Sequence, residues 1–315
     1  MMVIYHCFGG SHSSVTAAAI HLGLLSRHRL PTAAELLALP YFDGRSRGEE
    51  GDLKYMGTDA YGNKVYAVGK KNLGARFETF LYNLAAVIGI PRRNILLLNT
   101  SPLVNMSMRI GGFISRRMGL TFLGRPLVVW GTRRAFPRLG LFVAENRNLW
   151  QNNRITPLKP SIKRNIIIYA CFSGTHAAVV AAALHAGRLS FHHLPDWKEL
   201  KELPHFDTPE GQGGLRFFAL TPSGHAVYTA AVGHDGETAK RAAATFLAAW
   251  DGEPERVLWI DVSGRVSFFW RIGAFCRRYN YLGWLGRLFL RWSLARDYHV
   301  IGDIVKKTKR QEKGE

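Results

Sequence analysis

Apolar and polar residues form blocks along the chain that predict strands and helices in a recurring order. Residues 3–7 are a short apolar run, too short for a helix, and predict a buried strand. A turn with two glycines follows, and residues 13–22 are rich in alanine, which favours a helix. The same order of apolar run, turn and alanine-rich run returns at residues 167–187.

The rest of the first half contains further blocks. Residues 32–39 predict a short helix, because Thr32 and Glu35 have the spacing of a capping box. Residues 53–56 and 64–68 predict a hairpin, residues 73–88 an amphipathic helix, and residues 95–98 a second buried strand. Residues 106–118 predict another helix, whereas residues 127–130 fit either a last strand or the start of a helix.

The second half repeats this order almost throughout. Tyr5, Cys7, His12 and His21 each have the same residue type 164 positions later, and Pro40–Asp43 reappears as Pro204–Asp207. This match indicates a tandem duplication. We expect two homologous three-layer α/β domains at residues 1–144 and 164–305, each with a mainly parallel sheet and a hairpin. Residues 145–163 are predicted to be a linker, and residues 306–315 a disordered basic tail.

Composition narrows the possible environments and partners. The formal net charge of +19 predicts an anionic partner: a phosphate-containing small molecule, nucleic acid or anionic lipid. Three cysteines without a paired spacing predict neither a disulfide framework nor a metal site. Because this cysteine usage fits a reducing compartment, we expect a cytoplasmic protein, with attachment to the membrane periphery left open. No apolar run is long enough for a transmembrane segment. The pattern does not indicate a cofactor or an oligomeric state.

The glycine turn before the alanine-rich helix is the main candidate site. A strand, a tight turn and a helix start expose backbone N–H groups that suit an anion. The predicted ligand-binding residues are Gly9, Gly10, Ser11, Ser13 and Ser14 in the first copy, with Gly174 and Thr175 in the second. Since Ser13 and Ser14 become Ala177 and Ala178, the first loop is expected to bind an anion more tightly.

The same turn contains the candidate catalytic residues. Cys7 and Cys171 end the strands, where a helix N-terminus can lower the pKa of a thiol, and His12 and His176 lie in the turns. The alternative is that each cysteine is a small buried apolar residue and each histidine caps local backbone. His21 and His185 fall inside the helices, which favours a structural role.

Arginines form a second candidate surface. Residues 79–144 contain nine arginines and no acid, and residues 262–296 contain seven arginines and no acid. Guanidinium groups bind phosphate, and the neighbouring aromatic residues suit either bases or a membrane surface. The candidate ligand-binding arginines are Arg109, Arg116, Arg117 and Arg271. A solvated basic face around an ordinary core is the alternative.

Two resemblances accompany these patterns. The run IYHCFGGSHSSVTAAAIHLGLL, followed by DAYGNKVYAVG, is similar to an uncharacterised bacterial domain-of-unknown-function family of about one-domain length. That resemblance implies two fused domains and no known activity. Cys7, Gly10 and Ser13 also resemble the phosphocysteine loop of sugar-phosphotransferase IIB domains, a pattern that the second copy breaks at Ala177.

These observations favour a duplicated binding module for a phosphorylated or anionic ligand. A phosphoryl-transfer or phosphate-ester enzyme that uses Cys7 or His12 is the second hypothesis. The third is a peripheral membrane or nucleic-acid binding protein that acts through the arginine segments. The loops lack an acidic cluster for Mg²⁺, which phosphoryl transfer usually needs, so binding is favoured over catalysis.

Overall fold

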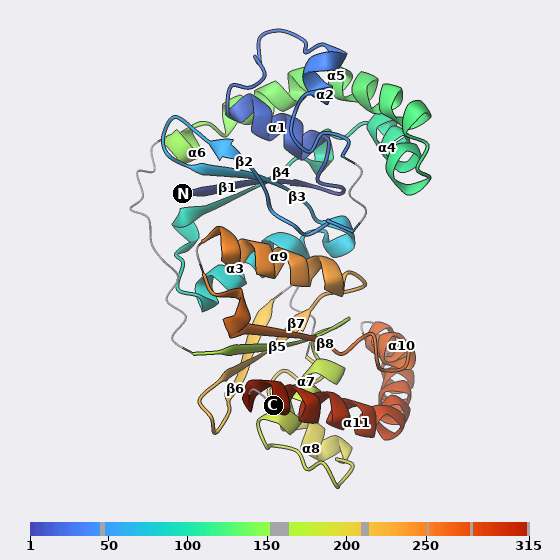
Figure 1. Cartoon of the computed structure of the whole chain (residues 1–315). Helices are drawn as coiled ribbons and strands as arrows, with labels where there is room; N and C mark the ends of the chain where they lie inside the picture. Colours follow the sequence, from blue (N-terminus) through green and yellow to red (C-terminus); the bar gives the residue numbers. More distant parts are fainter. Residues whose placement is uncertain (45–47, 152–163, 209–213, 251, 278–279, 314–315) are drawn as a thin grey trace. The chain divides into compact units, whose positions relative to one another are not determined.

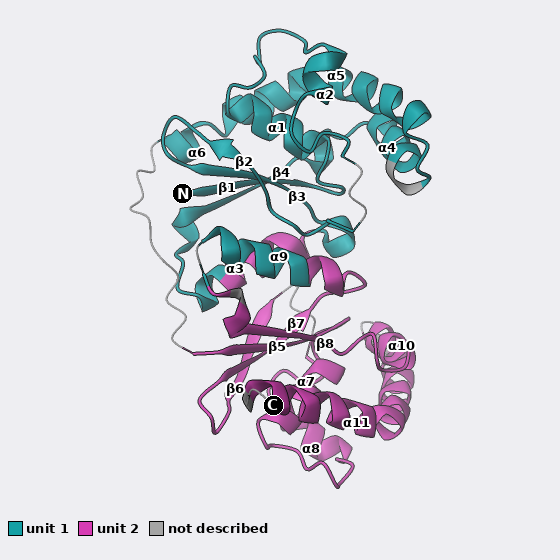
Figure 2. Ribbon diagram, viewed as in Figure 1, with its two compact units in different colours: residues 1–74, 85–160, 240–252 teal, residues 75–84, 161–239, 253–315 magenta. Residues whose placement is uncertain are grey.

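The structure is a computed structural model that describes residues 1–44, 48–151, 164–208, 214–250, 252–277 and 280–313 (Figure 1). Its contacts divide the chain into two compact units (Figure 2). The first comprises residues 1–74, 85–160 and 240–252, and the second comprises residues 75–84, 161–239 and 253–315. Each unit contains one four-stranded sheet, and the two units are described separately.

The sheet of the first unit contains β1 (Met2–Cys7), β2 (Lys54–Thr58), β3 (Lys64–Gly69) and β4 (Ile95–Asn99). The strand order is β2-β3-β1-β4, with β1 parallel to both of its neighbours and β2 antiparallel to β3. All six residues of β1 are buried, as expected of a central strand that is covered on both faces. The carboxyl ends of β1, β3 and β4 therefore meet at one edge of the sheet.

The helices of this part of the chain are α1 (Ser13–His21), α2 (Ala33–Leu37), α4 (Met106–Gly112), α5 (Thr121–Glu145) and α6 (Asn148–Gln151), while α3 (Arg76–Val87) spans the division between the units. Short 3₁₀ turns lie at Lys71–Leu73, Arg92–Asn94 and Ser101–Leu103, and a π-helical segment, η4 (Phe113–Arg117), follows α4. Residues 13–20 of α1 are all buried, because α1 packs against both the sheet and α5.

The second unit repeats this topology. Its strands are β5 (Ile166–Cys171), β6 (Leu215–Leu220), β7 (Ala226–Ala231) and β8 (Val257–Asp261), in the order β6-β7-β5-β8. Its helices are α7 (Ala177–His185), α8 (Trp197–Lys201), α10 (Phe269–Cys276) and α11 (Gly283–Lys313), and α9 (Gly236–Ala249) spans the division between the units. Short 3₁₀ turns lie at Pro254–Arg256 and Asn280–Leu282. The predicted α/β fold and tandem duplication are confirmed.

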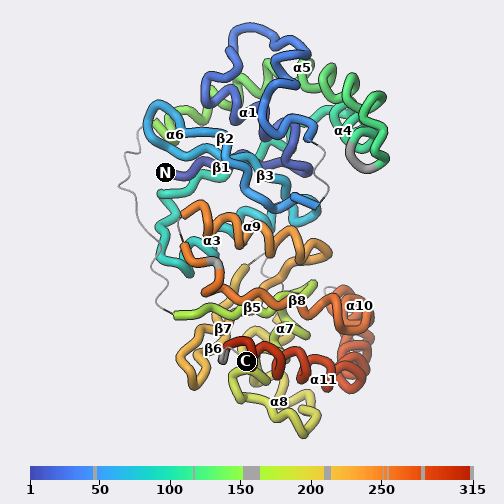
Figure 3. The backbone as a smooth tube through the Cα atoms, in the orientation of Figure 1, coloured from blue at the N-terminus to red at the C-terminus, as the bar shows by residue number. Residues whose placement is uncertain are grey.

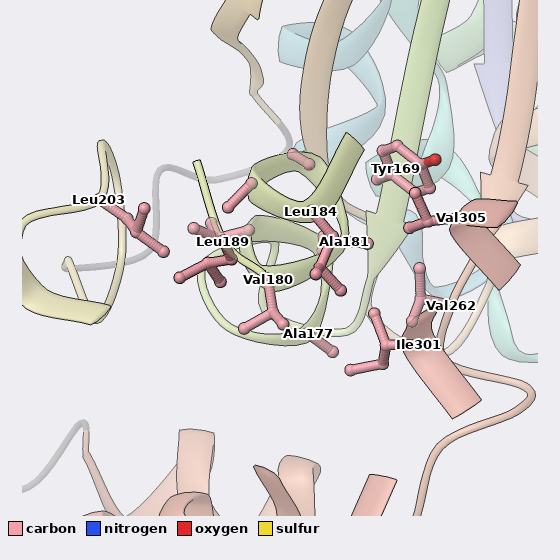
Figure 4. Close-up of a cluster of buried hydrophobic side chains, with 14 of the residues drawn as sticks. Tyr169, Ala177, Val180, Ala181, Leu184, Leu189, Leu203, Val262, Ile301 and Val305 are labelled. Atoms are coloured by element: carbon pink, nitrogen blue, oxygen red, sulfur yellow. The ribbon is translucent and has the colours of Figure 1, made fainter. Parts of the chain in front are cut away.

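The core of the second unit surrounds α7. Val180, Ala181 and Leu184 on this helix belong to one buried cluster with Val262, from the end of the sheet, and Ile301 of α11 (Figure 4). Burial of a valine, leucine or isoleucine side chain contributes about 1.5–3 kcal/mol to the free energy of folding. The alanine-rich sequence lets α7 approach its neighbours closely.

Several local predictions are confirmed. Thr32 and Glu35 form the capping box of α2, and residues 54–69 form the predicted hairpin. Residues 127–130, which fitted a strand or a helix, lie inside α5. Residues 106–118 do not form one regular α-helix, because η4 interrupts them.

The prediction of a disordered tail is wrong for residues 306–313, which form the last turns of α11. Thr308 is buried there, and the Glu312 carboxylate binds His185 and His225. Residues 314–315 lie outside the described residues, as do residues 152–163 of the predicted linker. Residues 148–151, at the start of that linker, form α6.

Candidate functional site

The loop after β1 crosses the end of the sheet before α1 begins at Ser13, a path that can be followed in Figure 3. Gly10 has a φ of 69°, and a Cβ there would lie 2.2 Å from the backbone nitrogen of Gly69 at the end of β3. Both the conformation and the close approach therefore require glycine at this position. Gly174 repeats the geometry with a φ of 72° and a Cβ position 2.7 Å from the Ala231 nitrogen.

The Cys7 thiol lies inside this loop and is 4% exposed. Its Sγ accepts a hydrogen bond from the Gly10 N–H at 3.1 Å and lies 3.3 Å from the Ser14 hydroxyl. Burial raises the pKa of this thiol, but hydrogen bonds from Ser14, Ser13 and Gly10 outweigh burial and leave the pKa below its ordinary value. The loop therefore favours the thiolate form of Cys7.

The two serines that were expected to contact an anion are engaged within the protein. Ser14 contacts the sulfur of Cys7, and the Ser13 hydroxyl lies 3.0 Å from the Thr100 hydroxyl, just past β4. Both serines are fully buried. Ser11 is 1% exposed, and its carbonyl accepts the N–H of Asp43. The structure thus brings the loop and the segment after β4 together at the carboxyl edge of the sheet.

His12 belongs to a buried ionic network. Its Nε2 lies 3.2 Å from Oδ1 of Asp43, whose carboxylate also accepts hydrogen bonds from the Ser115 hydroxyl and from Nε of Arg125 at 3.0 Å. Burial raises the pKa of the Asp43 carboxyl, but the hydrogen bonds from His12, Arg125 and Ser115 outweigh burial and leave the pKa below its ordinary value. The carboxylate is therefore charged at neutral pH and orients the imidazole.

The backbone of Asp43 is itself unusual. Its φ is 47°, in the left-handed region, and Asp207 at the equivalent place has a φ of 53°. Residues other than glycine rarely adopt this conformation, although aspartate and asparagine tolerate it best. Both copies of the domain therefore place the aspartate at a strained position, where its backbone holds the loop and its side chain holds the histidine.

The second repeat has the same histidine–aspartate pair with different neighbours. Nε2 of His176 lies 3.3 Å from Asp207, and Arg277 donates to both carboxylate oxygens of Asp207, with Nε at 2.8 Å. Burial raises the pKa of Asp207, but these hydrogen bonds outweigh it and leave the pKa below its ordinary value. Nδ1 of His176 lies 3.0 Å from the Ser173 hydroxyl, which is 3.9 Å from the Cys171 sulfur. Ser173 thus links the thiol to the imidazole.

A small pocket opens beside this loop in the second repeat. Its cavity volume is about 10 Å³, which is the space that one water-sized group occupies. Its polar lining residues are Cys171, Ser173, His176, Ser263, Ser267 and Arg271. The guanidinium of Arg271 lies over the ring of Phe268 and 3.5 Å from Nδ1 of His234. The pocket therefore combines hydroxyl groups, an imidazole and a cation.

Two hydroxyl groups of this lining have no partner within the described part of the chain. The side-chain oxygens of Ser263 and Ser267 are buried without a hydrogen bond there, and so is the Ser101 oxygen at the equivalent place in the first repeat. An unmet buried hydroxyl costs roughly 1–3 kcal/mol. A group that enters the pocket from solvent would remove this cost.

The other predicted residues are found in different surroundings. Arg109 is exposed on α4, and the side chains of Arg116 and Arg117 lie outside the described part of the structure. Gly9 is half-buried and adjoins Gly69, and Thr175 is buried, with its carbonyl accepting the Asp207 N–H. Of the four predicted arginines, Arg271 is the one that lines the pocket.

His21 and His185 are structural, as expected. Nδ1 of His21 accepts the Tyr5 hydroxyl at 3.0 Å, and its Nε2 binds Asp59. Burial lowers the pKa of His21, although Asp59 opposes this effect. His185 pairs in the same way with Tyr169 and Glu312.

Sequence reasoning missed the partners of the histidines and the pocket serines. Asp43 and Asp207 lie 31 residues beyond His12 and His176, so the local motif does not contain them. The repetition of Pro40–Asp43 as Pro204–Asp207, which indicates the duplication, is also the sequence signal that could have identified these aspartates. Ser101 and Ser263 likewise follow the second buried strand in each half.

Across the residues that the structure describes, no group of three or more histidine, cysteine or acidic side chains is arranged to hold a metal ion. A family model described as a protein of unknown function (DUF3189) matches residues 2–148 and again residues 166–310. No curated protein and no solved structure matches the chain.

Proposed function

The chain belongs to the DUF3189 family and contains two copies of its domain, and from the site alone we propose that the second repeat binds the anionic end of a phosphorylated small molecule. The pocket between the loop after β5 and the start of α10 is the proposed binding site. The observation that carries the proposal is the pair of unpartnered hydroxyls, Ser263 and Ser267, that line this pocket beside Arg271.

The residue types of the pocket select for an anion. Arg271 supplies a permanent positive charge and several N–H donors, and the two serine hydroxyls supply neutral donors. Three acids lie near the pocket, and each is engaged by donors of the protein. Asp207 binds Arg277, Asp297 accepts hydrogen bonds from the Ser267 N–H and from Nε1 of Trp270, and Asp261 accepts the Ser263 N–H. The donors of Arg271 and of the two serine hydroxyls therefore suit phosphate better than a cation.

The size of the pocket limits what can enter. A cavity of about 10 Å³ admits one oxygen-sized group, so we expect a terminal phosphate oxygen to enter while the rest of the ligand stays at the mouth. The ring of Phe172 lines the pocket, and the guanidinium of Arg271 lies over the ring of Phe268. Affinity then depends on contacts outside the cavity as well as on the anion.

Calorimetric titration with inorganic phosphate, pyrophosphate and a nucleoside monophosphate tests this proposal. Replacement of Arg271 by alanine is expected to weaken binding by roughly tenfold or more, since hydrogen bonds from charged groups contribute about 1.5–3 kcal/mol. Ser263→Ala should weaken it less. Arg291→Ala is the matched control, because Arg291 is an exposed arginine of the same repeat that does not line the pocket.

Two results would contradict the proposal. One is the absence of binding heat and of any rise in Tm at millimolar ligand, since a ligand of the folded state must stabilise it. The other is an equal loss of affinity in the Arg271→Ala and Arg291→Ala variants, which would indicate general attraction to a basic protein.

A second candidate function is covalent catalysis by Cys7. The hydrogen bonds that favour its thiolate form are the observation in its support. In this alternative the sulfur attacks a phosphorus atom and the oxygen of the ester leaves. Cys7→Ser should then leave phosphate binding intact and abolish a phosphorylated form of the protein, detected by mass spectrometry after mixing with acetyl phosphate.

A further inference from the structure

Large apolar side chains of α4, η4, α5 and the residues that connect them are exposed to solvent. Exposure is highest for Phe122 at 71% and Met106 at 65%, and Trp130 is 53% exposed. The complete set, which we name the first apolar tip, is Met106, Ile110, Phe113, Met118, Leu120, Phe122, Leu123, Leu127 and Trp130. Single exposed apolar residues are ordinary, but a patch of this extent indicates an interaction surface.

The architecture of the helix pair forces these side chains outward. A Cβ on Gly111 would lie 2.8 Å from the carbonyl oxygen of Gly124, and a Cβ on Gly131 would lie 2.8 Å from the nitrogen of Met108. The two helices therefore pack through their backbones, with glycines at the contact. Because the buried positions between the helices hold glycine, the large apolar residues remain on the outer faces.

The second repeat presents the same surface from the same elements. Gly273 and Gly286 make the equivalent close contact between α10 and α11. The exposed residues, named the second apolar tip, are Phe268, Phe275, Tyr281, Trp284, Leu288 and Trp292. Trp284 is 69% exposed and Tyr281 is 73% exposed. The apolar identity of the surface is thus retained in both copies, although most of its residues differ.

Arginines surround both tips, and acids are missing from the sequence around them. Residues 79–144 and 262–296 contain no aspartate or glutamate. Arg134 lies over the ring of Trp130, and Arg296 lies over the ring of Trp292. Among the described arginines of residues 79–144, Arg125 contacts a carboxylate, that of Asp43. Arg109, Arg133, Arg134 and Arg138 therefore present largely uncompensated positive charge.

We propose that each apolar tip docks on the surface of an anionic lipid bilayer. Exposed aliphatic and aromatic side chains would enter the boundary of the acyl chains, while the arginines contact lipid phosphates. Methionine, leucine and isoleucine cannot stack with bases, so the composition of the first tip favours a lipid surface over nucleic acid. No helix that the structure describes is both long and apolar enough to cross a membrane.

The first apolar tip lies in a different repeat from the pocket, whereas Phe268 of the second apolar tip lies against Arg271, which lines the pocket. The first apolar tip therefore tests this inference independently of the pocket. Its test is flotation of the intact protein with vesicles of phosphatidylglycerol and phosphatidylcholine, beside vesicles of phosphatidylcholine alone. We expect binding to the anionic vesicles, with a fraction that persists at high salt because apolar contacts are not screened. Phe122→Ser combined with Leu123→Ser should lower partitioning by roughly tenfold or more.

Leu141→Ser is the matched control. Leu141 is 63% exposed on the same helix, α5, but lies about 28 Å along the axis from Phe122. Its replacement should leave partitioning unchanged. Trp284→Ser combined with Leu288→Ser tests the second tip separately, and circular dichroism confirms that each variant is folded.

Three results would overturn the proposal: no flotation with anionic vesicles, equal losses in the Leu141→Ser and Phe122/Leu123 variants, or unchanged partitioning of both tip variants. A titration with a fluorescent oligonucleotide completes the experiment. Tight oligonucleotide binding without vesicle binding would assign the arginines to nucleic acid and reject the lipid surface.

Discussion

The thiol of Cys7 shows how a few hydrogen bonds set the chemistry of one residue. Gly10 and Ser14 donate to the sulfur, and neither bond depends on a distant element. In the second repeat Ala178 replaces Ser14, and a different hydroxyl, that of Ser173, lies 3.9 Å from the Cys171 sulfur. The two thiols therefore have different hydrogen-bond partners, which follow from the local sequence of each loop.

We predict that Ser14→Ala makes Cys7 less reactive near neutral pH. Loss of the hydroxyl raises the pKa of the thiol, so the fraction of thiolate at pH 7 should fall by about tenfold. The measurement is the pH profile of reaction with a small methanethiosulfonate, in a chain where Cys171 and Cys276 are replaced by serine. Ser26→Ala, at an exposed serine, is the control. Identical profiles for Ser14→Ala and its parent would refute the assigned bond.

The histidine partners were harder to predict than the thiol environment. Cys7, Gly10 and Ser14 are neighbours in sequence, so local geometry alone brings them together. Asp43 reaches His12 only because the chain returns to the loop and the Asp43 N–H binds the Ser11 carbonyl. Such a contact depends on the path of a 31-residue segment, which a local pattern does not contain.

At the scale of elements, the predictions succeeded where local signals agree. The capping box of α2 and the buried run of β1 are local, and both are confirmed. The long helix α5 was missed because it contains Pro126 and Pro137, which normally end a helix. Both prolines are exposed, and packing of the buried face, which includes Phe136, offsets their cost. The many charged residues at the end of the chain favoured a disordered tail in the sequence analysis, although Ile304, Val305 and Thr308 are buried in the last turns of α11.

The loop after β1 gives a matched pair of glycine substitutions. Gly10 and Gly23 have similar φ values, 69° and 73°, but a Cβ at Gly23 meets nothing within 4 Å. Gly10→Ala should therefore destabilise the protein by several kcal/mol, while Gly23→Ala should cost about 1 kcal/mol for its conformation alone. Urea unfolding measures both. Equal losses of stability in the two variants would contradict the close approach of Gly10 to the backbone of Gly69 in β3.

At the scale of the whole molecule, the same buried carboxylate network occurs once in each repeat. Asp43 and Asp207 both have a folded-state pKa below the ordinary value near 3.9. A lowered pKa means that the charged form stabilises the folded state above about pH 4. This contribution is lost as the pH falls through the folded-state value. Acid unfolding should therefore report on both sites together.

We predict that the double variant Asp43→Asn and Asp207→Asn loses about 3 kcal/mol of stability at pH 7. Each replacement removes hydrogen bonds to a charged carboxylate, among them those from Arg125 and Arg277, whose side chains are 42% and 24% exposed. The stability of the double variant should also fall less than that of the parent between pH 5 and pH 3. Asparagine tolerates the left-handed backbone, so the change isolates the charge. Denaturant unfolding at each pH measures this, with Asp303→Asn, at a carboxylate 73% exposed, as the control. Parallel pH profiles for parent and double variant would contradict the network.

The arginine that compensates each buried aspartate comes from a different position in the two repeats. Arg125 of α5 binds Asp43, whereas Arg277, which follows α10, binds Asp207 at the place where the first repeat has Ser115. The second repeat still has Arg287 at the position equivalent to Arg125. A sequence that has arginine at both positions differs from each of the two arrangements by one replacement. After duplication, one repeat could therefore change the arginine that binds its aspartate without an intermediate in which that aspartate has no arginine partner.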